Sequence, residues 1–362
     1  MSRPYSRRLH CALMLAGAVA PFATYSALAK EKKHKYVVVD LGVLDGGDYS
    51  IGNAINNSGV VVGMATATGG SHAVKLEDLD LTGLASNDSA SSANDINKNG
   101  QAVGYISSAE TSGQRATLWH EAGETDLGTL GGPFSIAHGI NDKGDVVGQS
   151  TLADGIIAHG FLWHDGALAD LGTLGGEFSI AKDINAEGLI AGLSTSEPGQ
   201  QPYGPGTKAV LWGPDGMIDL GALGGDVAAA AGINSKGWVV GGATTEKGLE
   251  FGGPGTHAFV WKNDTLLDLG AFDGADFSNA NAINKDGQIV GFAGNPYASD
   301  PNNSMTATLW EEDGTMVNLN EAIDLVSGWF LVTAMGINDK GQITGLGITD
   351  GQYRGFLLEP VD

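Results

Sequence analysis

Cysteine is almost missing from this chain of 362 residues, because Cys11 is the only one. A single thiol allows no internal disulfide and no thiolate metal site. Long hydrophobic runs are missing as well. The apolar run at residues 11–20 has about half the length that a membrane-spanning helix needs. We therefore expect neither a disulfide framework nor insertion into a membrane.

Positive charge is scarce. Nineteen Lys and Arg residues stand against 42 Asp and Glu residues, which gives a formal net charge of −23. Such a surface repels the phosphates of nucleic acids and the headgroups of anionic lipids. We therefore predict no nucleic-acid partner, and we interpret the negative charge as a solubility feature of the surface.

Signatures of catalysis are also missing, since the chain contains no G-x-S-x-G, H-E-x-x-H, P-loop or G-x-G-x-x-G motif. Oxygen donors do alternate at Asn284, Asp286 and Gln288, as they do in calcium loops. However, Lys143 and Lys236 fill the middle position in two equivalent segments, and a calcium loop usually needs more than one carboxylate. We predict no catalytic residue, no metal ion and no cofactor.

What the chain does contain is a repeat. The pattern Ile-Asn-x-x-Gly-x-x-x-Gly begins at Ile55, Ile96, Ile140, Ile184, Ile233, Ile283 and Ile337. Each copy approaches Asn as an apolar strand, supplies a Gly where a tight turn needs a positive φ, and resumes as a strand rich in Val and Ile. The pattern therefore predicts seven β-hairpins.

Residues 135–176, the fullest copy, predict four strands joined by short turns. The first strand approaches Ile140, and the other three are expected at 145–150, 159–163 and 167–171. Periods of 41 to 54 residues with four strands each match the blades of β-propellers. The predicted fold class is all-β, a single seven-bladed β-propeller of four-stranded antiparallel blades.

Two further positions recur in the repeat. A tryptophan ends the third strand in five copies: Trp119, Trp163, Trp212, Trp261 and Trp310. We interpret these indoles as packing plates between adjacent sheets. A very small residue, Gly52 or an alanine, stands three positions before each repeat Ile, which we interpret as seven first strands converging on a crowded axis.

The two ends of the repeat array complement each other. The seventh copy ends at Pro360 without a fourth strand, whereas residues 36–42 have a fourth-strand sequence with no blade before them. An open ring would expose two sheet edges. We therefore predict that the N-terminal strand completes the last blade, and that the propeller spans residues 36–362.

The first residues are typical of an export signal. Three arginines precede the apolar run, and Ala27-Leu28-Ala29 is an A-x-A-like cleavage site. We predict a secretory signal peptide at residues 1–29, cleaved near Ala29, a charged flexible leader at 30–35, and a protein that is secreted, extracellular or periplasmic. Ser6-Arg7-Arg8 leaves twin-arginine export open beside the general secretory route.

At these motifs the chain resembles the HAF family of bacterial extracellular repeat proteins, which is named for a His-Ala-Phe motif. His257-Ala258-Phe259 matches the motif fully and His159-Gly160-Phe161 nearly, and the likeness covers essentially residues 36–358. The motif histidine is replaced at Arg115, Lys208, Thr306 and Arg354. These replacements argue against a general chemical role for the histidine. The resemblance implies an exported repeat protein and implies no reaction.

Loop lengths suggest where a ligand would bind. The second-to-third connections of repeats four to six are long and rich in Pro, Gly and aromatic residues. In a meander they share one face with the fourth-to-first connections, so they would form a raised crescent beside the channel mouth. We predict a monomeric, non-enzymatic binding protein for an unknown extracellular ligand, glycan or protein, with Tyr203, Phe251 and Tyr297 as ligand-binding residues.

Two other functions stay open. An exported hydrolase or lyase could act on a polysaccharide at the channel mouth with carboxylates from Asp48, Asp226 and Asp276, although these acids do not share one spacing to the repeat Ile. The second alternative is a purely structural protein of a surface or matrix. For such a protein we would expect no pocket and easy self-association.

Overall fold

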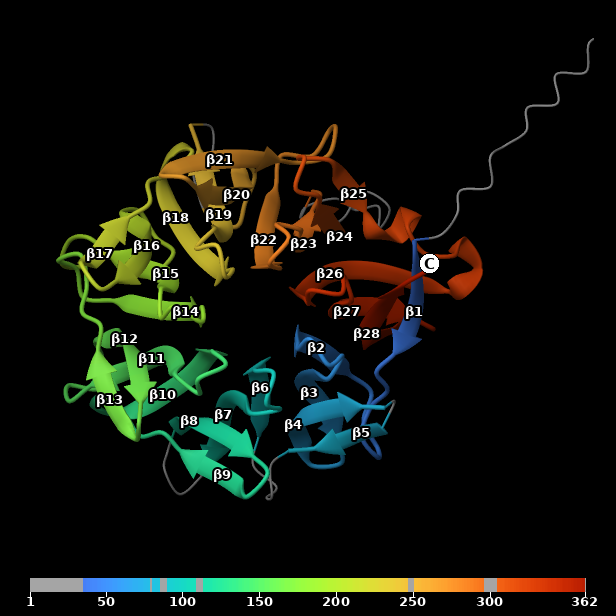
Figure 1. Cartoon of the computed structure of the whole chain (residues 1–362), viewed down its shortest axis with the longest axis horizontal. Helices are drawn as coiled ribbons and strands as arrows, with labels where there is room; N and C mark the ends of the chain where they lie inside the picture. The colour runs from blue at the N-terminus through green and yellow to red at the C-terminus, as the bar shows by residue number, and fades with distance from the viewer. Residues whose placement is uncertain are drawn as a thin grey trace, which may run out of the picture. The chain divides into compact units, whose positions relative to one another are not determined.

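Seven sheets surround a common axis in the computed structural model of the chain (Figure 1). The structure describes residues 35–78, 80–84, 90–108, 113–246, 251–295 and 305–361. Each sheet contains four strands with antiparallel neighbours, so the predicted seven-bladed β-propeller is confirmed. The predicted signal peptide and residues 30–34 of the leader lie outside the described residues.

The strands follow the chain blade by blade. Blades 1 to 3 comprise β2 (Ser50–Ile55), β3 (Val61–Ala67), β4 (Gly70–Glu77), β5 (Asp80–Gly83), β6 (Ser91–Ile96), β7 (Ala102–Ser108), β8 (Gly113–His120), β9 (Gly123–Asp126), β10 (Gly131–Ile140), β11 (Val146–Leu152), β12 (Ala158–His164) and β13 (Ala167–Asp170). Blades 4 to 6 comprise β14 (Ser179–Ile184), β15 (Ile190–Thr195), β16 (Thr207–Gly213), β17 (Gly216–Asp219), β18 (Gly224–Ile233), β19 (Val239–Thr245), β20 (Thr256–Lys262), β21 (Thr265–Gly270), β22 (Ser278–Ile283), β23 (Ile289–Ala293), β24 (Thr306–Trp310) and β25 (Met316–Asn318). Blade 7 combines β26 (Trp329–Ile337), β27 (Ile343–Thr349), β28 (Gln352–Pro360) and β1 (Tyr36–Asp40), and two short 3₁₀ helices, η2 (Leu319–Glu321) and η3 (Leu325–Ser327), precede it.

The repeated asparagine begins the turn after each first strand. In blade 3 the Oδ1 atom of Asn141 accepts hydrogen bonds from the backbone N–H groups of Lys143 and Asp145, both at 3.0 Å. The glycine three residues after each such asparagine has a φ between 74° and 92° in all seven turns. Glycine adopts this left-handed conformation without steric cost. The hairpins predicted from the repeat are therefore confirmed.

The second glycine of the repeat meets a different demand. A Cβ atom built on Gly148 would lie 2.0 Å from the carbonyl oxygen of Ile136 on the neighbouring first strand. The equivalent glycine is equally crowded in every blade, at 1.9 to 2.1 Å. Gly148 pairs with Ala137 immediately before a register shift in β10, so the glycine lets the two strands approach closely beside a β-bulge.

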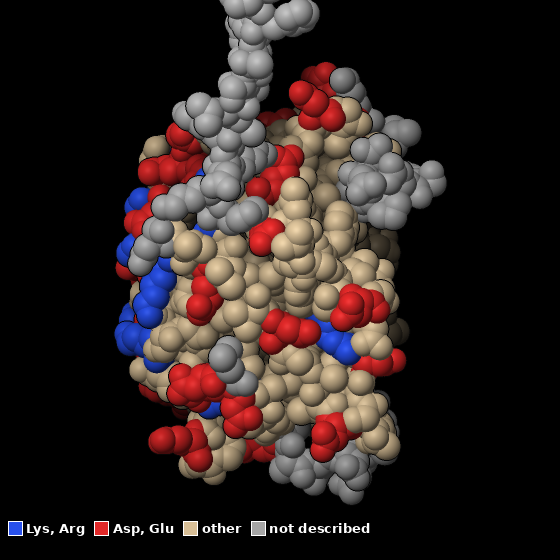
Figure 2. Space-filling model, turned by 90° about the vertical axis from the view of Figure 1, so that its right-hand side faces the viewer, with Lys and Arg blue, Asp and Glu red and all other residues tan. Residues whose placement is uncertain are grey.

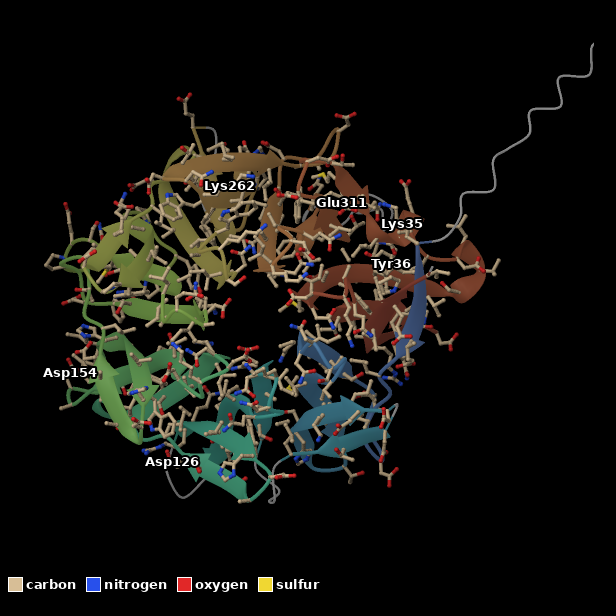
Figure 3. The ribbon with its side chains drawn as sticks, in the orientation of Figure 1. Lys35, Tyr36, Asp126, Asp154, Lys262 and Glu311 are labelled. Carbon is tan, nitrogen blue, oxygen red and sulfur yellow. The ribbon has the colours of Figure 1, made fainter. Side chains whose placement is uncertain are left out.

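The N-terminal strand closes the ring as predicted. β1 pairs antiparallel with β28, from Tyr36 opposite Pro360 to Asp40 opposite Phe356. In Figure 3, Lys35 and Tyr36 lie at the start of β1 with Glu311 of blade 6 nearby, and the Lys35 Nζ to Glu311 Oε1 distance is 3.8 Å. Burial and the charge of Glu311 raise the pKa of Tyr36 to about 12. The closing strand therefore contacts two blades.

The apolar core lies between neighbouring blades. One cluster joins Val103 and Ala116 of blade 2 to Ala137, Ile140 and Phe161 of blade 3. Ala137 is one of the small residues from which we predicted that seven first strands converge on a crowded axis. The first strands do converge on the axis (Figure 1), and the small residue has a further role. It packs against the preceding blade, because both sides of an innermost strand are covered by other sheets.

The recurring tryptophans are packing residues, as predicted. Trp119, Trp212 and Trp310 are at most 6% exposed, and Trp163 and Trp261 are partly buried against the interblade clusters. The indole Nε1 of Trp212 donates to the carbonyl of Leu171 in the preceding blade at 3.1 Å. Each indole therefore contributes apolar area to the interface between two sheets.

Charge is unevenly distributed over the disc. In the side view of Figure 2, most of the visible lysine and arginine side chains lie toward one edge, whereas aspartate and glutamate side chains are scattered across the side. Within the ranges given above, no helix is long and apolar enough to cross a membrane.

Candidate functional site

Each blade presents two ends to solvent. We call the end with the Ile-Asn turns and the third-to-fourth turns the turn face. The opposite end, with the second-to-third loops and the fourth-to-first connections, is the loop face. The strand order of every sheet places the predicted binding loops on the loop face.

Two of the three predicted ligand-binding residues come together there. The rings of Tyr203, from the β15–β16 loop of blade 4, and Phe251, from the β19–β20 loop of blade 5, have centroids 5.5 Å apart and an interplanar angle of 35°. Tyr203 remains 41% exposed, although burial around its hydroxyl raises the pKa of the phenol. Tyr297, the third residue, lies outside the described residues.

The aromatic pair is anchored to the blades beneath it. Phe251 is half-buried and packs against Ile180 and Leu193 of blade 4 and Ala229 of blade 5. Tyr203 has a φ of 63°, a conformation that costs a non-glycine residue roughly 1–3 kcal/mol when the surrounding structure imposes it. The ring of Phe251 thus anchors the β19–β20 loop to blades 4 and 5, while one side of the Tyr203 ring remains exposed to solvent.

Side-chain contacts fix the loop that carries Tyr203. Gln200 Oε1 accepts hydrogen bonds from the backbone N–H groups of Ser196 and Glu197, both at 3.0 Å. The N–H group of Gly199 donates to Glu177 Oε2 at 3.1 Å, which ties the loop to the connection that precedes β14. A loop held in this way loses little conformational freedom when a ligand binds.

The carboxylates of the hydrolase or lyase alternative have other partners. Asp226 Oδ1 lies 3.4 Å from Lys208 Nζ, and Asp276 Oδ1 lies 3.2 Å from His257 Nε2. Asp48 Oδ1 accepts a hydrogen bond from the hydroxyl of Thr66 at 3.1 Å. In the described part of the chain no hydrogen bond joins two of the three acids.

The histidine of the His-Ala-Phe motif contacts an aspartate on the neighbouring fourth strand. His159 Nδ1 lies 2.9 Å from Asp170 Oδ2, and His257 Nδ1 lies 2.9 Å from Asp268 Oδ2. His257 Nε2 also contacts Asp276 at 3.2 Å. The hydrogen bond to Asp268 raises the pKa of His257. The histidine therefore connects the third strand to the fourth rather than facing a ligand site.

Arginine can replace this histidine, and blade 2 shows how. Arg115 Nη2 lies 3.2 Å from Asp126 Oδ2, at the same place in its blade as the His159 pair in blade 3. Asp126 Oδ1 also accepts from the N–H of Gly128, whose φ is 87°. The residue at the motif position, histidine or arginine, therefore links the third strand to the aspartate of the fourth strand. This role needs no special chemistry of histidine, and it was not predicted from the sequence.

A ring of asparagines surrounds the axis on the turn face. The Nδ2 atom of each repeat asparagine donates to the backbone carbonyl of the asparagine in the next blade, at 2.9 to 3.2 Å. Asn338 completes the circle by donating to the carbonyl of Asn56 at 2.9 Å. All seven asparagines are 3–6% exposed. Sequence reasoning explained them as turn residues only, and the contact between blades was missed.

A hollow of about 250 Å³ opens at the centre of this ring, lined by the Ile, the Asn and the next residue of all seven turns. Its charged groups are already paired. Lys98 Nζ lies 3.1 Å from Asp142 Oδ2, and Asp339 Oδ1 accepts from the N–H of Lys285 at 3.0 Å. No group of three or more His, Cys, Asp or Glu side chains suited to a metal ion occurs among the residues described.

No family model matches the chain, and no curated protein matches it in sequence. Solved structures share its fold. The β-propeller domain of the Trilobed protease from Pyrococcus furiosus is 11% identical with a TM-score of 0.51, over 87% of this chain and 98% of that one. Streptogramin B lyase is also 11% identical with a TM-score of 0.51, over 90% of this chain and 98% of that one. At such low identity the likeness extends to the fold alone.

The Pyrococcus domain is described as having an open velcro topology. The present chain differs, because β1 and β28 are hydrogen-bonded along five residue pairs.

Proposed function

We propose that the protein is an exported, non-enzymatic binding protein that holds a neutral carbohydrate on the loop face of blades 4 and 5. The observation that carries this proposal is the Tyr203–Phe251 pair, in which one ring is anchored and the other is exposed. The apolar faces of sugar rings pack well on an aromatic surface, and Tyr in particular adds a large contact area at a low cost in conformational entropy.

Charge favours an uncharged ligand at this place. Glu177 and Glu197 belong to the Tyr203 loop region, and Asp226 lies near the start of β18, at the loop-face end of blade 5. With a net charge of −23 over the whole chain, anionic ligands would be repelled. A neutral glycan meets no such repulsion.

Export is part of the proposal. The charged start, the short apolar run and the Ala27-Leu28-Ala29 site support a signal peptide cleaved near Ala29. The resemblance of the repeat to the HAF family supports an extracellular or periplasmic site of action. The absence of cysteine after Cys11 means that the exported chain would need no disulfide to fold.

The experiment is a glycan array followed by calorimetric titration of the mature protein with the strongest neutral glycan. Tyr203→Ala is expected to weaken binding about tenfold or more, whereas Phe251→Leu keeps the packing of the loop and weakens binding less. Tyr353→Ala is the matched control, because Tyr353 is 51% exposed on another blade. Equal affinity of the Tyr203 and Tyr353 variants would disprove a site at the pair. A glycan cleaved during the titration would instead support the hydrolase or lyase.

A further inference from the structure

Two basic side chains lie at one level of the axial channel without a partner. His138 on β10 and Lys182 on β14 both stand two residues before the repeat Ile, in adjacent blades, and both are half-buried. Both strands contact the first strands of the blades on either side, and they lie on the inner side of the ring (Figure 1). In the described structure neither side chain forms a hydrogen bond or an ion pair, and His138 Nε2 is buried without a partner.

The same position in other blades shows how the chain satisfies a polar group there. Asn53, Asn94 and Asn281 each donate through Nδ2 to a carbonyl of the next blade at 2.8 Å. Blade 5 has Ala231 and blade 7 has Met335, which need no hydrogen-bonding partner. His138 and Lys182 follow neither solution.

Unpaired basic groups at half-buried positions are costly. Burial penalises the charged form, and a donor without a protein partner loses its hydrogen bond to water. The two strands lie close together at this level, because a Cβ atom built on Gly139, next to His138, would lie 3.1 Å from the carbonyl oxygen of Lys182. Burial lowers the pKa of both groups, and the charge of Lys182 lowers that of His138 further. An anion between them would offset both costs.

The nearby carboxyl groups do not supply this anion. Asp95 accepts hydrogen bonds from the N–H groups of Ile96 and Ile140, both at 2.8 Å, so each of its oxygens is bound to backbone. Burial, with smaller contributions from Asp183 and Asp142, raises the pKa of Asp95.

Asp183 is bound in the same way. Its two oxygens accept from the N–H groups of Ile184 at 2.7 Å and Ile233 at 2.8 Å, and burial raises its pKa. Both carboxyl groups therefore connect neighbouring first strands, and within the described residues neither forms an ion pair with His138 or Lys182.

We propose that His138 and Lys182 form a binding site for a small oxyanion, phosphate or sulfate or a phosphate monoester, inside the axial channel. The ammonium group offers three donors and the neutral imidazole one, which suits a tetrahedral group with several acceptor oxygens. Ile140 and Ile184, two residues after His138 and Lys182, line the hollow of about 250 Å³ on the turn face, so this hollow lies next to the proposed site. The site is separate from the Tyr203 surface, so either can be wrong without the other.

The test uses the repeat itself as a source of tolerated substitutions. Lys182→Ala introduces the residue that blade 5 carries at Ala231, and His138→Asn introduces the residue that blade 2 carries at Asn94. Lys98→Ala is the control, because Lys98 lines the hollow and pairs with Asp142 outside the proposed site. All proteins are titrated calorimetrically with sodium phosphate, sodium sulfate and glycerol 3-phosphate at low ionic strength and pH 6.5.

The wild type and Lys98→Ala are expected to bind at least one of the three anions equally well. Lys182→Ala should bind it at least tenfold more weakly, and His138→Asn at least threefold more weakly. Preference for an inorganic ion indicates a free oxyanion, and preference for glycerol 3-phosphate indicates a phosphorylated ligand. The proposal is overturned if no anion gives a heat of binding at concentrations up to about 10 mM, which is about 100 times a moderate Kd. It is also overturned if Lys98→Ala weakens anion binding as much as Lys182→Ala does.

Thermal unfolding gives a second readout that a purely structural role would not produce. Without anion, Lys182→Ala is expected to unfold at a higher temperature than the wild type, because it removes an unpaired buried charge. With saturating anion the order should reverse, because ligand binding stabilises only the wild type. A variant that is less stable than the wild type in both conditions would show that Lys182 stabilises the fold directly, and the proposal would be rejected.

Discussion

Replacing one asparagine of the ring by aspartate separates its two roles. Asn234 is 4% exposed, its Oδ1 accepts from the N–H groups of Lys236 and Trp238 at 3.0 Å, and its Nδ2 donates to the carbonyl of Asn284 at 3.1 Å. Aspartate keeps both acceptor bonds and therefore keeps the turn. It loses the donor and places a second oxygen about 3 Å from a buried carbonyl oxygen, a separation typical of the replaced hydrogen bond.

The expected loss follows from these contacts. The missing hydrogen bond contributes about 1 kcal/mol, and the new carboxylate, buried without a donor for its second oxygen, costs about 1–3 kcal/mol more. The Asn284 carbonyl keeps its hydrogen bond from the N–H of Gly287 at 3.1 Å. We expect Asn234→Asp to lower the free energy of unfolding by about 2–4 kcal/mol at pH 7. If the asparagine served the turn alone, the change would be close to zero.

The stability loss caused by Asn234→Asp should also depend on pH. Burial and the facing carbonyl raise the folded-state pKa of the new carboxyl above its unfolded value of about 3.9, because only the protonated form can donate to the Asn284 oxygen. The loss should therefore be smallest below pH 4 and grow as pH rises through the folded-state pKa. Urea unfolding of the variant and the wild type at pH 4 and pH 7 measures this difference.

A matched control is Asn263→Asp, in an exposed third-to-fourth turn where Asn263 has a φ of 51°. Both Asn and Asp tolerate this conformation, so we expect a change of about 0.5 kcal/mol or less. The reasoning is refuted if the free energies of unfolding of the Asn234 and Asn263 variants agree within error at pH 7.

Three further predictions concern the fold. Gly192→Ala should destabilise the protein by about 3 kcal/mol, because its Cβ would lie 2.0 Å from a backbone carbonyl oxygen. Gly188→Ala, at a positive φ in open space, should cost only about 1 kcal/mol. Similar urea midpoints for the two variants would contradict this prediction. His257 has a raised folded-state pKa, so its pair with Asp268 adds stability below about pH 6.5 that is lost as pH rises through that pKa. His257→Arg, which copies Arg115, should remove this slope between pH 5.5 and 8.5, and an unchanged slope would show that the pair is not its source. Tyr36→Ala, at a site 7% exposed, should cost about 3–4 kcal/mol and speed amide exchange in β28 more than in β16, and uniform exchange would argue against local opening of the closing blade.

Much of the fold was readable from the sequence because its causes are local. A strand that ends at Asn and a glycine that supplies a positive φ are properties of neighbouring residues, and seven copies reveal their order. Closure by residues 36–42 was also readable, because a fourth-strand sequence stood alone at one end and was missing at the other. The predicted fourth strand at 167–171 ends one residue later than β13 does.

The contacts between blades could not be read in the same way. Asn234 donates to a carbonyl 50 residues away, and any residue offers a carbonyl, so the sequence of the acceptor carries no signal. The approach of Tyr203 to Phe251 depends on the path of two irregular loops, one of which requires a positive φ at a tyrosine. Sequence placed both residues on one face, and only the structure placed them in contact.

The pairing of β1 with β28 also bears on how the molecule is made. Ribosomes deliver β1 before every other strand and β28 after all of them, so six blades can assemble while the seventh still lacks one member. Until translation is complete, the growing chain has a free sheet margin to which a neighbouring nascent chain could bind. A slower supply of the last residues, or a bulky fusion upstream of Lys35, should therefore reduce the yield of soluble protein more than it alters the stability of the finished ring.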